Sequence, residues 1–452
     1  MNLEADARPV ASLDREGVAD EGALGGARPA TLLGPLAIRD FRLVWGGQAI
    51  SLLGDQFHQI ALAWLILGLT GSGVALGLVL MAASIPRAIL MLVGGALADR
   101  TAPRTLMLAS DIARGLAVAV IAALVLTGRA ELPHLIVMAV VFGIADAFFL
   151  PAMQAIIPAV APGERLAPAN ALVQGTTQLM TLLGPVAAGV LVAAVGTGPA
   201  FVVDALSFAF AALALALVRT GRPASPPTAP GPVTAEVGTP SGGILGEIRA
   251  GLGYAFASAS IRAVVIVSAV INFAITGAFA VGLPWLIETH FEADAIAFGL
   301  VGATFGAGAL VGAIIGGSVA RPRRMGHVLL AIFAALGFVV AGFGLAPGPV
   351  AVVGLGLPLG LGIGYSNVVS ISWLGGYIEP DMRGRVMGLV MFAGAGLAPI
   401  SLALAGVLID TVGPGLFVAS GALVAVTSFG AIVSGAAHAL DRDAAPSRAT
   451  PV

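Results

Sequence analysis

A charged break between two long apolar runs, GGALADRTAPRT at residues 94–105, organises this chain. Two glycines precede an acid beside a base, Asp99 and Arg100, and a second base, Arg104, follows four residues later. Other breaks along the chain carry arginines, but this one places an acid directly before its arginine at the end of an apolar run. A weaker copy, GGSVARPRR at residues 316–324, lies about half a chain later.

The composition around this break is that of an integral membrane protein. The chain has 452 residues, of which 58% are hydrophobic and 10% charged, and its mean hydropathy is +1.00. A soluble domain carries about 25% charged residues. The lower charged fraction of this chain, with its large apolar fraction, indicates that its apolar surface lies in a bilayer. The formal net charge of −2 gives no basis for a nucleic-acid partner. The absence of cysteine excludes disulfides and thiolate metal sites.

Twelve apolar runs are long enough to cross a bilayer, which takes roughly 20 residues of helix. The first six cover about 44–69, 75–98, 105–127, 133–157, 168–195 and 199–218. The second six cover about 263–287, 297–320, 327–346, 350–377, 386–409 and 414–437. The sequence therefore predicts an all-α membrane protein with twelve transmembrane helices in two pseudo-symmetric six-helix bundles.

The arginines predict the topology. Every connection that follows an even-numbered run is basic, whereas the opposite connections carry only Arg129. By the positive-inside rule both termini are expected in the cytosol. Arginine supplies all 22 basic residues, and with the abundance of Ala and Gly this suggests a GC-rich bacterial genome and a multi-pass protein of the bacterial inner membrane.

The chain divides into two similar halves. We expect a disordered cytosolic tail at 1–37, a bundle at 38–219, a linker at 220–261 with an amphipathic helix at about 244–258, a second bundle at 262–437 and a cytosolic tail at 438–452. FGIAD at 142–146 matches LGIGY at 361–365 with nearly the offset of the two GG pairs. A parallel repeat of six helices is typical of a two-bundle transporter.

The break itself resembles the loop signature of the major facilitator superfamily. Its pattern is Gly95-x-x-x-Asp99-Arg100-x-x-x-Arg104, although Ala102 and Pro103 replace the usual Gly and Arg. Further segments resemble the branch that includes the enterobactin exporter and macrolide-efflux proteins, namely RDFRLVW at 39–45, SLLGD at 51–55, residues 151–158, ANAL at 169–172 and RGRVMG at 383–388. The resemblance covers about residues 38–437.

This resemblance implies a gate at the loop. In the family, the acid at the position of Asp99 is thought to pair with a basic residue and with the start of run eleven, which locks the outward-facing state; a helix N-terminus favours a nearby carboxylate. The alternative is that Arg100 and Arg104 only enforce topology. Asp111 and Arg114, three residues apart on one helix face, are expected to form a local salt bridge that supports the loop.

Run five carries Gly184-Pro185 and then Gly189, which resembles incompletely a motif of antiporters in this superfamily. Small residues let helices approach closely, and proline kinks a helix. The motif favours export, but ordinary tight packing explains these residues equally well.

Charged residues inside the membrane are the strongest candidates for function. A charge at a helix centre costs roughly 2.5–3.5 kcal/mol and needs a partner or a water-filled cavity. Asp55, Arg87 and Asp146 lie near the middle of runs one, two and four. We expect the two acids to couple protons and face substrate, with Arg87 as counter-charge. Burial and a nearby guanidinium shift the pKa of a carboxyl group in opposite directions, so a moving arginine could switch its protonation. The alternative is a fixed ion pair that ties the helices together.

Polar side chains extend the candidate site: His58 and Gln59 follow Asp55, run seven offers Asn272, and run ten offers Tyr365 and Asn367. His58 is either a proton relay or a packing residue. The second bundle has no acid near a run centre, so proton chemistry is expected in the first bundle. An aromatic, hydroxyl-lined wall in the second suits amphipathic organic molecules.

These observations predict a secondary active transporter, not an enzyme. There is no phosphate-binding Gly-Lys loop, no lysine and no metal-ligand spacing, so neither cofactor nor metal is expected and the proton gradient is the energy source. We expect a monomer that exports an amphipathic drug or siderophore-like metabolite by alternating access. The alternatives are an importer or symporter, a lysophospholipid transporter of the same fold, and a non-transporting receptor or scaffold.

Overall fold

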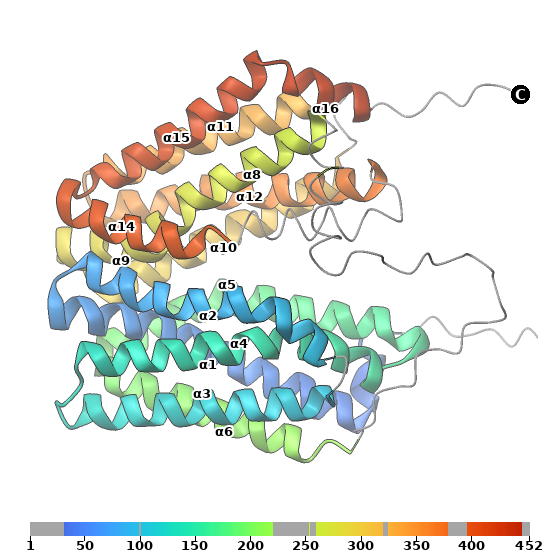
Figure 1. Cartoon of the computed structure of the whole chain (residues 1–452), viewed down its shortest axis with the longest axis vertical. Helices are drawn as coiled ribbons and strands as arrows, with labels where there is room; N and C mark the ends of the chain where they lie inside the picture. Colours follow the sequence, from blue (N-terminus) through green and yellow to red (C-terminus); the bar gives the residue numbers. More distant parts are fainter. Residues whose placement is uncertain are drawn as a thin grey trace, which may run out of the picture.

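Two bundles of long helices lie side by side in the computed structural model, which describes residues 31–98, 101–219, 253, 259–319, 324–377 and 396–444. In Figure 1 helices α1 to α6, blue to green, form the lower bundle, and α8 to α16, yellow to red, form the upper one. All regular structure in these residues is helical. The predicted all-α fold with two bundles is confirmed.

The first bundle consists of six long helices. Their bounds are α1 Arg39–Thr70, α2 Gly73–Ala98, α3 Pro103–Leu126, α4 Leu132–Val160, α5 Leu166–Val195 and α6 Thr197–Ala216, with short 3-10 turns η2 at Gly34–Ala37 and η3 at Gly163–Arg165. Helix α1 packs on α5 and α6, α2 packs on α4, and α3 packs on α4 and α6. Helix α1 ends where Gly71 takes the left-handed conformation, φ 62°.

The second bundle repeats the pattern with one irregular helix. Its first rod comprises α8 Ala259–Gly277, the π-helical segment η4 Ala278–Gly282, α9 Leu283–Trp285 and the π-helical segment η5 Leu286–His290. It is followed by α10 Ala295–Ser318, α11 Met325–Gly344, α12 Pro349–Tyr377, α14 Ala398–Val412, α15 Gly415–Val433 and α16 Ala436–Ala444. The two π-helical segments flank Pro284, which has no N–H for the helical ladder.

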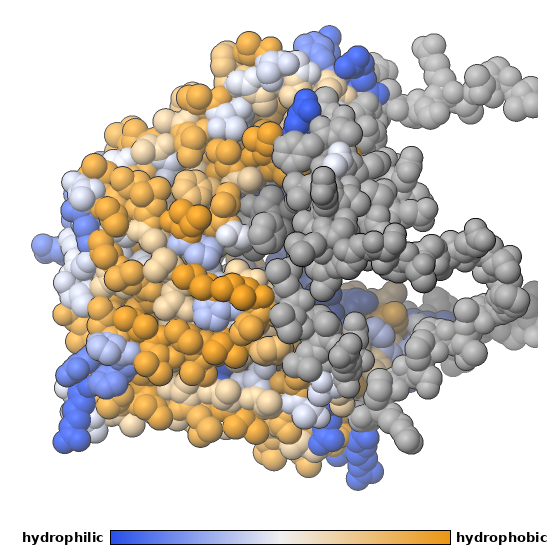
Figure 2. All heavy atoms as spheres, viewed as in Figure 1, coloured by the Kyte–Doolittle hydropathy of each residue, from blue (hydrophilic) through white to orange (hydrophobic). Residues whose placement is uncertain are grey.

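The helices have the length and apolarity of membrane spans. Among the described residues, 11 helices can cross a bilayer by length and composition, and α14, at 15 residues, lies at the end of the predicted run eleven. The earlier part of that run, 386–395, lies outside the described residues. In Figure 2 hydrophobic atoms dominate the sides of the described helices and polar atoms gather at their ends. The chain is a multi-pass membrane protein.

The helices of both bundles end on two sides of the molecule. The side where α1 begins at Arg39, α6 ends at Ala216 and α16 lies is called the terminal end (Figure 1). We call the distal end the one where α1 meets α2 at Gly71 and α14 meets α15 at Gly413.

The bundles contact one another mainly through two helix pairs, α2 with α14 and α5 with α10. Glycines make the close approach possible: a Cβ on Gly77 would lie 2.6 Å from the Leu402 carbonyl oxygen, and one on Gly189 would collide with the Ala295 carbonyl oxygen. Gly77, Gly189 and Ala295 lie in the distal halves of their helices, and Leu402 lies near the middle of α14. The bundles are therefore closed against each other at the distal end.

The expected domain bounds stay a prediction. The described part of α8 runs from Ala259, close to the expected start of the second bundle at 262, and α16 occupies Ala436–Ala444, around the expected start of the C-terminal tail at 438. Except for residue 253, the predicted amphipathic helix at 244–258 lies outside the described residues, as does most of the N-terminal tail.

Candidate functional site

A cavity of about 570 Å³ lies between the bundles and contains the three mid-membrane charged residues expected from the sequence in its lining. Helices α1, α2 and α4 bring Asp55, His58, Gln59, Arg87 and Asp146 to its wall. These five side chains come from three different helices of the first bundle. The cavity thus unites the midplane charges of the first bundle in one place.

The second bundle closes the cavity with an apolar wall. Thr276 on α8, Phe279 and Ala280 on η4, Pro284 on α9 and Phe298 on α10 line it. With Phe142, Leu62, Leu76 and Met138 of the first bundle they form a hydrophobic and aromatic lining. The wall includes the π-helical segment η4, and π-helical turns inside helices are frequent at functional sites.

The second-bundle residues expected from the sequence are not among those lining this cavity. The side-chain amide of Asn272 donates to the Ser268 carbonyl of its own helix at 2.9 Å, and Asn367 is exposed. Tyr365 is half-buried on α12, which packs on α10; its backbone lies against Gly312 and Gly316. The wall here is made by α8, η4, α9 and α10 because those elements, not α12, face Asp55 and Asp146 across the cavity.

Arg114 on α3 is the centre of an ion-pair network. Its guanidinium lies 2.7 Å from Asp111 Oδ1 and 3.1 Å from Asp146 Oδ1. The i,i+3 pair of Asp111 and Arg114 is thus present. It lies beside the cavity, since the same guanidinium also contacts Asp146, which lines the cavity. Arg114 itself lines the cavity.

Two arginines flank Asp146 in different ways. Arg114 has a side chain only 5% exposed, and its guanidinium stacks over Phe149 at 4.3 Å and Phe208 at 4.7 Å. Arg87 lies 3.9 Å from Asp146 Oδ2 with a side chain 45% exposed. Cation–π contacts and burial fix Arg114, whereas Arg87 makes a longer, more open contact.

His58 pairs with an acid that the sequence reasoning missed. Its Nδ1 lies 3.1 Å from Oδ2 of Asp204, which is fully buried on α6. The imidazole ring also stacks on Phe142, with ring centroids 4.5 Å apart. Asp204 lies inside the apolar run 199–218, so an acid within a predicted span was a signal that could have found it.

Asp55 differs from the other acids of the cavity. Among the described residues, no hydrogen bond or ion pair engages its carboxylate. The charged groups that interact with it electrostatically are Arg114, Asp204, Asp146 and His58. It lines the cavity and is half-buried. Asp55 is therefore the acid most available to a proton or a ligand.

The charge balance of this region is acidic. Four carboxylates, those of Asp55, Asp111, Asp146 and Asp204, stand against two guanidiniums, Arg87 and Arg114, and one imidazole. A cluster of this kind in a low-dielectric environment is stabilised by taking up protons or a cation.

The predicted gating loop is described only at its edges. Gly95 lies within α2, and Asp99 and Arg100 lie outside the described residues. Arg104 on α3 donates to the carbonyl oxygens of Leu215 and Ala216, at 2.8 and 2.6 Å, and so caps the C-terminal turn of α6. The expected partner at the start of run eleven also lies outside the described residues, so the latch stays a prediction.

The motif of run five lies at helix contacts. Gly184 faces Gln56 of α1, while Pro185 and Gly189 face α10, where Gly299 and Ala295 approach their backbones. The motif thus lies in both the α1–α5 contact and the contact between bundles.

A further acid outside the predicted set joins the bundles at the distal end. The carboxylate of Asp410 on α14 accepts from Ser72 Oγ at 2.6 Å and from the backbone N–H groups of Gly73 and Val74 at 2.7 and 3.0 Å. It caps the N-terminus of α2, a helix of the other bundle, where a negative charge is favoured. Sequence alone gave no signal for this pairing, since the partners are more than 330 residues apart.

Comparison with known proteins identifies the family. The family model described as transmembrane secretion effector, of the major facilitator superfamily, matches residues 30–355, which is more than half of the chain. The chain belongs to this family. This family and this fold are those of transporters and not of enzymes.

Curated relatives extend the likeness over most of the chain. The chain is 23% identical over 390 residues to macrolide efflux protein A of Streptococcus pyogenes, covering 85% of this chain and 93% of the relative. It is 26% identical over 396 residues to the multidrug efflux pump Tap of Mycolicibacterium fortuitum, covering 85% and 91%. Both of these relatives are named as efflux proteins, in line with the branch that the sequence motifs resemble.

Solved structures support the same fold. A bacterial homologue of the iron transporter ferroportin, in an inward-facing state, matches with a TM-score of 0.66 and 14% identity, covering 87% of this chain and 98% of the other. The nucleoside transporter NupG matches with a TM-score of 0.63 and 13% identity, covering 89% and 99%. At these identities the likeness concerns the fold alone.

Proposed function

We propose that this major facilitator protein exports an amphipathic organic compound from a bacterial cell in exchange for protons. One observation carries the proposal: a single cavity between the bundles combines the unengaged carboxylate of Asp55, the Asp146 network and an aromatic wall from both bundles. The efflux functions named for the two curated relatives favour export over import.

The arrangement suggests how binding and proton uptake are linked. Phe142, Phe279 and Phe298 offer apolar surface to a substrate, while Asp55 offers a charge or a hydrogen bond. Arg114 is held by aromatic rings and Asp111, so it stays with Asp146. Arg87 has the longer contact and can leave. Its departure would leave Asp146 with Arg114 as its remaining partner, which makes the Arg87–Asp146 pair a second candidate for coupling.

The distal contacts suggest the direction of the cycle. The arginine-rich terminal end is placed in the cytoplasm by the positive-inside rule, so the closed distal end faces outward. Substrate enters from the cytoplasm, the distal contacts of α2–α14 and α5–α10 separate, and substrate leaves. Protons taken up by Asp55 and Asp146 from outside then reset the protein, which works as a monomer in the inner membrane.

An efflux-deficient bacterium that expresses the chain tests this proposal. We expect lower sensitivity to some amphipathic drugs, and loss of that protection when an uncoupler collapses the proton gradient. Asp55→Asn and Asp146→Asn are expected to abolish protection at unchanged expression, whereas Glu164→Gln, an exposed acid outside the cavity, retains it.

Three outcomes would contradict the proposal. Protection that survives the uncoupler would exclude proton coupling. Full activity of both asparagine variants would remove these acids from the mechanism. Uptake of a nutrient, or no transport at all across a broad panel of compounds, would favour an importer or a receptor instead.

A further inference from the structure

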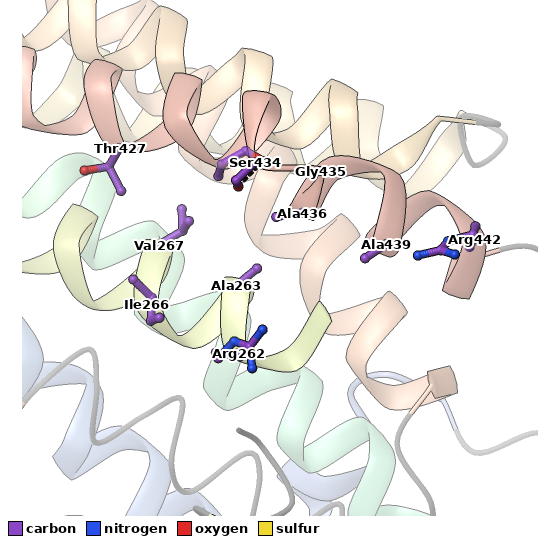
Figure 3. Close-up of a pocket in the computed structure, with 11 residues that line it drawn as sticks. Arg262, Ala263, Ile266, Val267, Thr427, Ser434, Gly435, Ala436, Ala439 and Arg442 are labelled. Atoms are coloured by element: carbon purple, nitrogen blue, oxygen red, sulfur yellow. Dashed lines mark hydrogen bonds between the residues drawn. The ribbon is translucent and has the colours of Figure 1, made fainter. Parts of the chain in front are cut away.

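A second cavity, of about 440 Å³, lies on the outer side of the second bundle, away from the central site. Helices α8, α15 and α16 surround it at the terminal end (Figure 3). Two arginines line it from opposite sides, Arg262 on α8 and Arg442 on α16. The proposed transport cycle makes no use of either residue.

The cavity is cationic at one end and apolar along its length. Ala263, Ile266 and Val267 of α8 face Ala431 of α15. The lining continues from Ser434, the residue after the end of α15, back along α15 to Thr427, seven residues or roughly 10 Å. Ile266 is 46% exposed, which leaves apolar surface open beside the arginines. The charges lie at the end of the helices and the apolar lining extends toward their middle.

Helix α16 is held so that Arg442 points into this cavity. The Asp441 carboxylate accepts from the Gly326 backbone N–H at 2.7 Å and pairs with His327, both at the start of α11. The His327 ring in turn lies edge-on to His438, with ring centroids 4.6 Å apart. These contacts dock one face of α16 on α11, and the next residue, Arg442, is directed to the other side, toward α8 (Figure 3).

We propose that this cavity binds one anionic phospholipid of the membrane leaflet at the terminal end. The two guanidiniums bind the phosphodiester headgroup, and an acyl chain lies along Ile266, Val267 and Ala431. Basic pockets between transmembrane helices on the cytoplasmic side bind anionic headgroups in this way. Arg262 has a further interaction within the protein, but a guanidinium has five N–H donors and can bind a phosphate as well.

Native mass spectrometry of the full chain in detergent, titrated with phosphatidylglycerol, tests the proposal. We expect one tightly bound lipid, and binding weaker by on the order of tenfold in the double variant Arg262→Gln/Arg442→Gln. Arg324→Gln is the matched control, because this exposed arginine lies at the same end of the same bundle but outside the cavity. It is expected to bind the lipid normally.

A second variant keeps both charges and fills the apolar lining. Ala431→Phe is expected to weaken phosphatidylglycerol binding as well, which separates loss of the site from loss of folding in the arginine variant. Phosphatidylcholine is expected to bind more weakly, and inorganic phosphate is expected not to displace the lipid.

Several results would overturn the proposal: equal binding of phosphatidylcholine, displacement by inorganic phosphate, equal loss in Arg324→Gln, or unchanged binding in both cavity variants. Because the measurement is lipid binding, its outcome is independent of the proposed drug export.

Discussion

At the scale of single residues, the acids of the site differ in whether they have a charged partner. Asp111 and Asp146 are paired with Arg114, Asp204 with His58, and Asp55 has no direct partner among the described residues. A charged group inside a membrane protein is tolerated when it is paired or faces a cavity. Asp55 satisfies only the second condition, which distinguishes it from the acids that hold the bundle together.

Arg114→Gln is expected to destabilise the protein, because it leaves the buried Asp111 carboxylate and Asp146 without their partner. Removing one member of a buried pair costs about 3–5 kcal/mol. The melting temperature of the purified protein in detergent measures this loss. Arg129→Gln, at the exposed turn between α3 and α4, should leave it unchanged.

A double-mutant cycle makes this prediction specific. Asp111→Asn combined with Arg114→Gln should be less destabilising than the sum of the single changes, because the two side chains lie 2.7 Å apart. Strict additivity would show that Arg114 acts on stability through packing on Phe149 and Phe208 and not through its charge.

At the scale of helices, the contact between bundles combines a packing device and an electrostatic one. Gly77 and Gly189 allow backbones of opposite bundles to touch, and Asp410 adds three hydrogen bonds at the N-terminus of α2. Glycine contacts tolerate separation because they involve few directional bonds, whereas the Asp410 contact favours one arrangement. The closed distal end is thus held in part by the Asp410 carboxylate, a single side chain that a point mutation can remove.

Asp410→Asn is expected to favour opening of the distal end. It removes a negative charge from a helix N-terminus, an effect of about 0.5–2 kcal/mol, or roughly a 2- to 30-fold shift in the closed-to-open ratio. The chain has no cysteine, so spin labels on Arg129→Cys and Val350→Cys, at the distal end of each bundle, report the separation by electron–electron distance measurement.

Asp294→Asn is the matched control for this experiment. Asp294 also caps a distal helix N-terminus, but it accepts from Ile296 and Ala297 within its own bundle. It should leave the distance distribution unchanged. An equal shift in both variants, or no shift in Asp410→Asn, would show that the contact between bundles is not what closes this end.

At the scale of the whole molecule, the two halves are packing units that contact each other mainly through two helix pairs, α2–α14 and α5–α10. The expected linker at 220–261 joins the halves in sequence. Within each half the helices pack mainly on helices of the same half, such as α1 on α6 and α11 on α15.

A protease site inserted in the Pro/Gly/Thr-rich segment 220–243 tests this description. After cleavage in detergent, the two fragments should co-elute on an affinity tag placed on one of them, and the melting temperature should change little. Separation of the fragments would mean that the covalent linker, not the helix contacts, holds the bundles together.

The sequence by itself determined the membrane fold, the two-bundle division and the presence of charges at mid-membrane. These follow from local properties: apolar run length, arginine position and the high cost of an unpaired charge in lipid. Asp55, Arg87, Asp146 and His58 could be chosen in this way because a charge or imidazole inside an apolar run is conspicuous wherever the run lies in space.

Only the tertiary structure decided which of those charges are partners. Arg114 forms ion pairs with Asp146 as well as with Asp111, and His58 pairs with Asp204. Asp410 accepts hydrogen bonds at the N-terminus of α2. The cavity wall of the second bundle comes from α8, η4, α9 and α10, not from α12. Such pairings depend on how helices rotate and cross, which is fixed by contacts between residues hundreds of positions apart and leaves no local pattern in the chain.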